Sequence, residues 1–204
     1  MGASIKNYDK FVNETAEIQA FTVDKLSNAV VRVMDKIAED EEIFKLLYFE
    51  DEKSLKYDLD ENPVAKEAFE KKSIIKHNSD SQRIKPNPFN SKAQEKHECF
   101  VRIYFNQGSI DKGGFIAKNQ MNIDIIVSHG LWLTTDPDKQ LKLVRPYAIM
   151  SRIIDILESE KIDKLPTPTG YTHLTVNEKF ECIRIYANLI STEKENNEEI
   201  SSGS

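Results

Sequence analysis

The chain has 204 residues, of which 39% are hydrophobic and 30% are charged, and its formal net charge is −6. This length predicts one domain with a proper core, and the composition excludes a disordered or fibrous protein. The negative charge argues against broad nucleic-acid binding, which needs a basic face. No apolar run approaches the ~20 residues of a membrane span, and residues 1–7 lack the apolar core of a secretory signal. We therefore expect no membrane segment and a protein that works, or is assembled, in the cytoplasm.

The first quarter of the chain predicts an arm followed by two helices. Residues 1–22 are mixed and polar, and we expect an arm or a short helix that docks on a neighbour. The next helix is indicated by apolar residues at steps of four, three and four: Leu26, Val30, Val33 and Ile37. Asp40 is placed to cap a second, very apolar helix that ends near Phe49. Together these helices predict a hairpin packed on the core.

The region from 53 to 97 carries weaker signals. Asn62 and Pro63 predict the start of a helical turn, and residues 73–76 predict a short edge strand. Residues 77–97 form a long polar stretch with two prolines. Compact domains seldom carry a structureless loop of more than ~12–15 residues without a use for it. We therefore expect residues 77–97 to be a partner-binding loop.

A β-hairpin is predicted after this loop. Apolar residues alternate over 99–105, and glycines over 106–114 predict a long, flexible tip. The second strand runs to Val127, with apolar residues at its odd positions and with Asn122 and Asp124 at even ones. This period of two predicts a half-buried strand that presents Asp124 to solvent.

The C-terminal part predicts the largest helix and a last strand. Asp136 and the proline after it suit a helix start, and apolar residues recur from 143 to 157 at helical spacing. Arg145-Pro146 interrupts this pattern, so either the true start lies nearer Arg145 or the helix kinks at the proline; of these we expect a kinked or stepped start. Residues 165–170 predict a stiff connector, and residues 180–190 predict a strand.

These elements predict an α+β fold: a mainly antiparallel β-sheet, made of the β-hairpin and further strands, covered by one long amphipathic helix and an N-terminal helix pair. The expected organisation is an N-terminal arm over 1–22, a single domain over 23–190 and an acidic, flexible tail over 191–204.

Signals for chemistry are few. The 4 histidines share no helical face and have no metal-ligand spacing. Cys99 and Cys182 lie in predicted strands, where cysteine usually serves as a small buried hydrophobe. No phosphate-binding loop, dinucleotide fingerprint or nucleophile elbow is present. We expect no metal, no cofactor and no catalysis.

Several of these motifs occur in a characteristic order: Leu46–Phe49, Phe100–Phe105, Ile123–His129, Trp132 and Leu143–Met150. Over residues 26–157 this order resembles the head-to-tail connection proteins of tailed bacteriophages, the group of tail terminators, tail-completion proteins and neck proteins. The resemblance implies a non-enzymatic virion subunit that is assembled in the host cytoplasm. It implies a ring, a hexamer in preference to a dodecamer, that joins the tail tube to the connector around a DNA channel.

The partners implied are further copies, neighbouring connector proteins, and tail tube or sheath proteins. DNA would pass through without specific binding, which suits an acidic chain because neutralised phosphates bind tightly. Trp132 is expected to close the core or to anchor an interface. The candidate contacts with other subunits or partners are Phe11, Arg83, Pro86, Phe89, Ile110, Lys112, Phe115, Trp132, Arg145 and Arg152.

Two alternatives remain open at this stage. The first is a phage-encoded, metal-dependent DNA-processing enzyme that uses Asp124, Glu98 and either His97 or His129. The second is a cytoplasmic adaptor that binds a peptide along an exposed strand edge.

Overall fold

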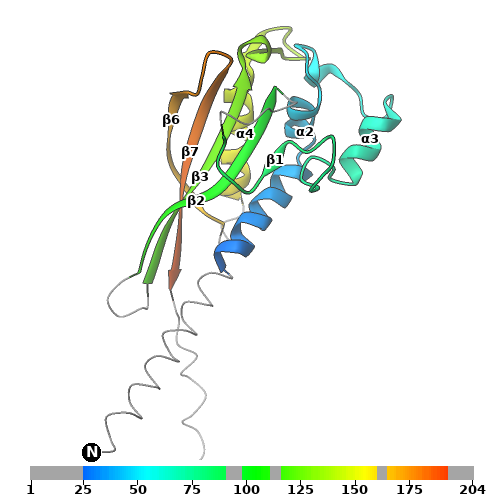
Figure 1. The fold of residues 1–204 in the computed structure, drawn as a ribbon. Coiled ribbons are helices and arrows are strands. Elements are labelled where there is room, and N and C mark those ends of the chain that lie inside the picture. The colour runs from blue at the N-terminus through cyan, green and yellow to red at the C-terminus, as the bar shows by residue number, and fades with distance from the viewer. Residues whose placement is uncertain (1–24, 91–97, 111–115, 160–164, 193–204) are drawn as a thin grey trace, which may run out of the picture.

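The computed structural model describes residues 25–90, 98–110, 116–159 and 165–192 (Figure 1). Residues 25–39 are helical, and the further helices are α2 (Glu41–Tyr48), α3 (Pro63–Glu70) and α4 (Arg145–Ser159). The strands are β1 (Ile84–Lys85), β2 (Cys99–Ile110), β3 (Ile116–Ser128), β4 (Leu133–Thr135), β5 (Lys142–Val144), β6 (Thr167–Thr175) and β7 (Phe180–Thr192). No helix in the described ranges is long and apolar enough to cross a membrane.

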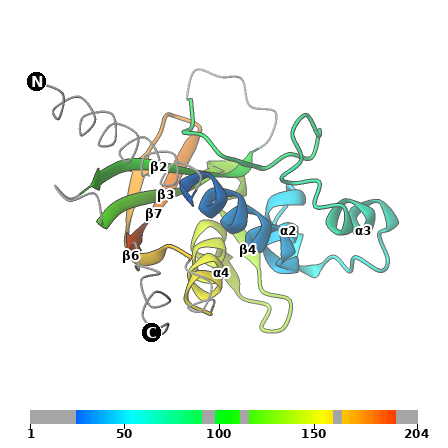
Figure 2. The ribbon, with the colours of Figure 1, turned by 90° about the horizontal axis from the view of Figure 1, so that it is seen from below.

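Five strands form one sheet in the order β1-β2-β3-β7-β6, while β4 and β5 pair separately. β1 runs parallel to β2, and every other neighbouring pair is antiparallel. The helix over 25–39, α2 and α4 lie on one face of this sheet, where α4 contacts β3, β7 and β6, and α2 contacts β2, whereas α3 packs beside α2 (Figure 2). The α+β fold predicted from the sequence, with its mainly antiparallel sheet covered by helices, is therefore confirmed.

One large apolar core lies between the helices and the sheet. The period-2 residues of β3 and β7 face it, and so does one stripe of each long helix. Its fully buried members include Val33, Ile37, Phe44, Leu47, Ile123, Ile125, Ile149, Ile153, Ile183 and Ile185. Helix starts follow the predicted caps. The Asp40 side chain accepts a hydrogen bond from the Ile43 N–H (2.8 Å), and the Asn62 side chain accepts one from the Ala65 N–H (3.1 Å).

The predicted kinked start of the largest helix is wrong. Asp136 accepts hydrogen bonds from the N–H groups of Asp138 and Lys139, both at 2.9 Å, and so closes the turn between β4 and β5. α4 begins only at Arg145. Pro146 therefore lies in the first turn, where a missing N–H costs no helical hydrogen bond and no kink follows.

Three other boundaries differ from expectation. Residues 73–76 form a turn, and the short edge strand is β1 instead. β2 continues through residues 106–110, which were expected in the flexible tip. Residues 167–170 open β6 rather than a connector, and a register shift lies between Pro168 and Gly170. Proline is tolerated there because β6 is an edge strand.

The second face of the sheet is also covered, so the expected exposure of Asp124 is wrong. Asn122 is 0% exposed and Asp124 is 3% exposed. The alternation correctly separated these residues from the core side of β3, but it gave no information about what covers the other side. A second apolar cluster lies on this face: Phe100, Ile126, Phe180 and Cys182, with Phe89, Leu174 and Val176 packed against them.

Both cysteines are free and buried in strands, as predicted. Burial raises the pKa of each thiol to about 12. Because the thiolate is the reactive form, we expect neither thiol to react with Ellman's reagent at about pH 8 until the chain unfolds. Rapid release of the coloured product from native protein, without denaturant, would contradict this burial.

Candidate functional site

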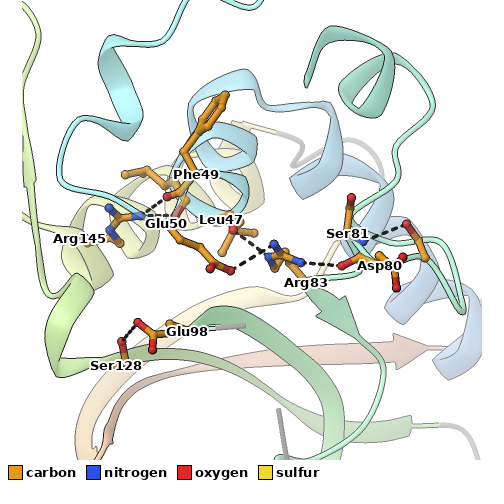
Figure 3. Close-up of polar contacts among 11 residues, drawn as sticks. Leu47, Phe49, Glu50, Asp80, Ser81, Arg83, Glu98, Ser128 and Arg145 are labelled. Carbon is orange, nitrogen blue, oxygen red and sulfur yellow. Dashed lines mark hydrogen bonds and ion pairs between the residues drawn. The ribbon is translucent and has the colours of Figure 1, made fainter. Parts of the chain in front are cut away.

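Two arginines from distant parts of the chain converge on the C-terminal end of α2 (Figure 3). One is Arg145, the first residue of α4, which is 0% exposed. Its Nη1 donates to the carbonyl oxygens of Leu46 (2.7 Å) and Phe49 (3.0 Å). Its Nη2 donates to the carbonyl oxygen of Asp51.

The other is Arg83, immediately before β1. Its Nε donates to the Leu47 carbonyl oxygen (3.1 Å), and its Nη1 donates to that of Asp80 (3.2 Å). Its Nη2 lies 3.3 Å from the Glu50 carboxylate. Arg83 therefore joins β1 to the same helix end from the opposite side (Figure 3).

The last carbonyls of a helix lack partners within it and carry the negative end of its dipole, so cations with several donors suit this position. Burial lowers the pKa of Arg83 and of Arg145, but a guanidinium remains charged in proteins. The sequence suggested both residues as contacts to neighbouring subunits. The structure instead places them inside the chain, as the cap of α2.

Arg152 of α4 is also engaged within the chain. Its guanidinium reaches both oxygens of Asp40, at distances from 2.6 to 2.9 Å, and one oxygen of Glu42 at 2.7 Å. Hydrogen bonding to Asp40 raises the pKa of Arg152. α4 is thus bound to both ends of α2, by Arg145 at one end and by Arg152 at the other.

Three other suggested contacts come from loops. Pro86 is exposed. Phe89 packs on the second face of the sheet, with its ring 5.1 Å from that of Phe100. Trp132 is half-buried against the main core. Ile110 ends β2, and Phe11, Lys112 and Phe115 lie outside the described residues.

A buried ion pair on the second face was not anticipated. Arg184 of β7 donates to both carboxylate oxygens of Asp124, with Nε at 2.6 Å from Oδ1 and Nη2 at 2.8 Å from Oδ2. The Tyr104 hydroxyl donates to Asp124 Oδ2 (2.9 Å) and accepts from Arg184 Nη2 (2.9 Å). Hydrogen bonding to Asp124 raises the pKa of Arg184, and burial raises that of Tyr104. The three groups form a closed network beside a concavity of about 370 Å³ that Phe89 and Leu174 also line.

This arrangement bears on the enzyme alternative. Both oxygens of Asp124 are occupied, Glu98 pairs with Lys179 (2.9 Å), and His129 lies 3.3 Å from Glu181. Ser128 also donates to Glu98, at 3.0 Å (Figure 3). His97 lies outside the described residues. Within the described ranges, no group of three or more His, Cys, Asp or Glu side chains is arranged to hold a metal ion.

A second polar cluster lies where β6 and β7 approach the loop after β3. The Glu181 carboxylate lies 2.5 Å from His173 Nε2, and His173 stacks on Trp132 with ring centroids 5.8 Å apart. Together with His129 these residues line an open concavity of about 360 Å³. No pattern in the sequence indicated this cluster because β6, which carries His173, was not predicted.

The sheet extends beyond the helical layer at one end (Figure 1). We call this end the distal blade: residues 106–110 of β2, 116–120 of β3 and 188–192 of β7. Its exposed side chains are mostly polar, and apart from Asn106 the register places them on the second face of the sheet: Gln107, Ser109, Lys118, Asn188 and Ile190. On the other face of the blade, Asn119 and Leu189 are buried.

Both outer edges of the sheet have open stretches. β6 pairs with β7 on one side, and no strand in the described ranges pairs with its other side. At the opposite edge, β1 pairs only with Val101 and Arg102 of β2. From Ile103 to Ile110, the outer side of β2 has no partner among the described strands. Such edges present rows of backbone donors and acceptors.

A family model named YomW matches residues 40–189, which is more than half of the chain. The chain belongs to the YomW family. A comparison with curated proteins gives no match.

The YomW match runs from the N-cap of α2 to Leu189 of β7. It therefore contains both arginines that cap α2, the Asp124–Arg184 pair, and the strands of the sheet, with β7 only as far as Leu189. The helix over 25–39 and the outermost residues of β7 lie outside the YomW match.

Proposed function

We propose that this chain is a structural subunit of a ring at the head–tail junction of a tailed bacteriophage, a tail terminator or tail-completion protein. In this role it joins the tail tube to the connector around the DNA channel. The proposal starts from the order of motifs over residues 26–157. The observation that carries it furthest is the distal blade.

The blade presents one exposed face to a possible neighbour. The exposed Asn106, Gln107 and Lys118 lie past the helical layer, whereas the same strands are fully buried at Ile103 and Ile123. A ring offers a partner for this exposed face because each copy can place this end against the next copy or against the tail tube.

The charge of the chain supports the same role. A net charge of −6 does not favour tight contact with phosphates. A channel lined by such subunits lets DNA slide instead of holding it. The rigid attachment of α2 to α4 by Arg145 and Arg152 suits a subunit that must keep its shape under load.

The first experiment measures the mass of the full chain by light scattering behind a sizing column, with negative-stain images of each peak. We expect a hexamer, six times the 23.4 kDa chain, with a central hole. Ile190→Asp places a charge on the blade, at a residue that is 60% exposed, and is expected to shift the mass toward the monomer. Val64→Asp on α3, at a residue that is 71% exposed, is the matched control and is expected to leave the hexamer intact.

The enzyme alternative predicts different results. A single chain that cleaves DNA when Mg²⁺ is added, and loses this activity on Asp124→Ala, would overturn the structural role. A ring with a central hole and no cleavage would support it.

A further inference from the structure

We infer that neighbouring copies in the ring join edge to edge, with β6 of one copy pairing antiparallel to the outer side of β2 in the next, so that one sheet runs around the ring. This inference rests on the proposed ring. It specifies which surfaces of neighbouring copies are in contact, which the proposed ring does not determine by itself.

The first argument is the chemistry of the two edges. The outer side of β6 offers its most regular backbone from Tyr171 to Thr175, because the register shift between Pro168 and Gly170 interrupts the part before it. The outer side of β2 is open from Ile103 to Ile110 among the described strands, with a bulge at Asn106 between Phe105 and Gln107. Each edge thus presents a stretch of at least five residues, in which every second residue points its N–H and C=O groups outward toward a partner or water.

The second argument is direction. The four long strands β2, β3, β7 and β6 alternate in direction across the sheet. β6 therefore runs opposite to β2. Copies related by rotation about an axis roughly along the strands bring β6 beside the next β2 in antiparallel orientation, which keeps the alternation unbroken.

The third argument is symmetry. Pairing β6 with β2 joins two different surfaces, which is the heterologous contact that generates a closed ring of more than two copies. Pairing β6 with β6, or β2 with β2, would instead give a two-fold dimer. The two open edges of one sheet thus match the requirement of the proposed ring.

The fourth argument fixes the register. The pairings within the sheet place Tyr171 level with Ile103, through Ile185 and Ile123. If β6 paired with the next copy in this level register, its C-terminal end would collide with β1 of that copy, which already pairs with Val101 and Arg102. Sliding β6 by four residues toward the blade removes this collision. It lays residues 173–175 along residues 103–105, with Tyr171 and Thr172 beside the bulge at Asn106.

A shift of four residues over four strands is one residue per strand. Closed barrels whose strands tilt by ~36° have about this stagger between neighbouring strands. The shift that β1 imposes is therefore compatible with closure. It places Thr172 beside Asn106 of the next copy, the bulged residue of β2.

The test uses Asn106→Cys combined with Thr172→Cys in the full chain, under mild oxidation and on a non-reducing gel. We expect a ladder of linked species up to the copy number of the ring, because opposite residues of paired strands lie within disulfide reach. Asn106→Cys with Val64→Cys is the control and is expected to give no ladder. The native thiols do not interfere because both are buried.

A second measurement does not depend on register. Amide hydrogen exchange is compared between the ring and the chain dissociated by dilution or by Ile190→Asp. We expect slower exchange in the ring over residues 171–175 and 103–107, and unchanged exchange in α3.

The outcomes separate the two proposals. A ring without the ladder, and with β6 exchange equal to that of the single chain, overturns the edge pairing and leaves the ring role standing. A dimer formed by Asn106→Cys alone points to β2–β2 contact and also overturns it. A chain that stays single in the mass measurement, and binds extended peptides at β6, overturns both proposals and favours the adaptor.

Discussion

Replacing Arg145 with methionine is expected to lower the free energy of unfolding by about 3 kcal/mol or more, because each buried carbonyl left without a donor costs about 1–3 kcal/mol. Three carbonyl oxygens lose their donor together, those of Leu46, Phe49 and Asp51. Methionine keeps much of the side-chain volume, so the lost stability reflects the missing hydrogen bonds and not a new cavity. The measurement is urea unfolding followed by circular dichroism.

Arg145→Lys tests the geometry of the cap. A lysine ammonium is a compact charge and lacks the planar fork that reaches three acceptors, so this variant is expected to recover only part of the loss. Arg152→Met is the matched control on the same helix, where the side chain is 37% exposed, and is expected to cost about 1 kcal/mol or less. Equal unfolding midpoints for Arg145→Met and Arg152→Met would show that the cap of α2 does not stabilise the domain.

The second large effect is expected at the ion pair on the other face of the sheet. Arg184→Met leaves the Asp124 carboxylate, which is 3% exposed, with only the Tyr104 hydroxyl as a described side-chain donor. We expect a loss of about 3 kcal/mol, at the lower end of the range for an uncompensated buried charge. The lower end applies because the Arg184 side chain is 26% exposed and water reaches this site.

A double-mutant cycle measures the interaction free energy between Asp124 and Arg184. Asp124→Asn with Arg184→Met removes both charges and is expected to be clearly more stable than Arg184→Met alone, because no buried charge remains. The measurement is again urea unfolding at fixed pH. Additive losses in the double variant would mean that the two side chains stabilise the sheet independently, against the geometry described above.

Local signals in the sequence were sufficient for much of this fold. Asp40 and Asn62 start the helices that their side chains cap, and the alternation in β3 and β7 identified the core side of both strands. These signals depend on residues close together in the chain. β6 was missed because it is an edge strand in which no residue is fully buried, and apolar and polar residues do not alternate in its sequence. β4 and β5 have 3 residues each, too few for a period to show.

The contacts of the candidate site were harder to predict because they join distant residues. Asp124 meets Arg184 through the register between β3 and β7, which no local pattern specifies. Arg83 and Arg145 looked like exposed cations in the sequence, and only the tertiary structure places them against the end of α2. The open edges of β2 and β6 likewise follow from strand order and not from composition.

The double cap of α2 also has a consequence for the order of folding during synthesis. Arg83 lies 36 residues after the carbonyl of Leu47, and Arg145 lies 99 residues after that of Leu46. The end of α2 therefore stays incomplete on the ribosome until the chain through the first turn of α4 has emerged. Contacts between residues so far apart in the sequence form late, because closing a long loop costs conformational entropy. We expect nascent chains that stop before Arg145 to remain sensitive to protease in α2.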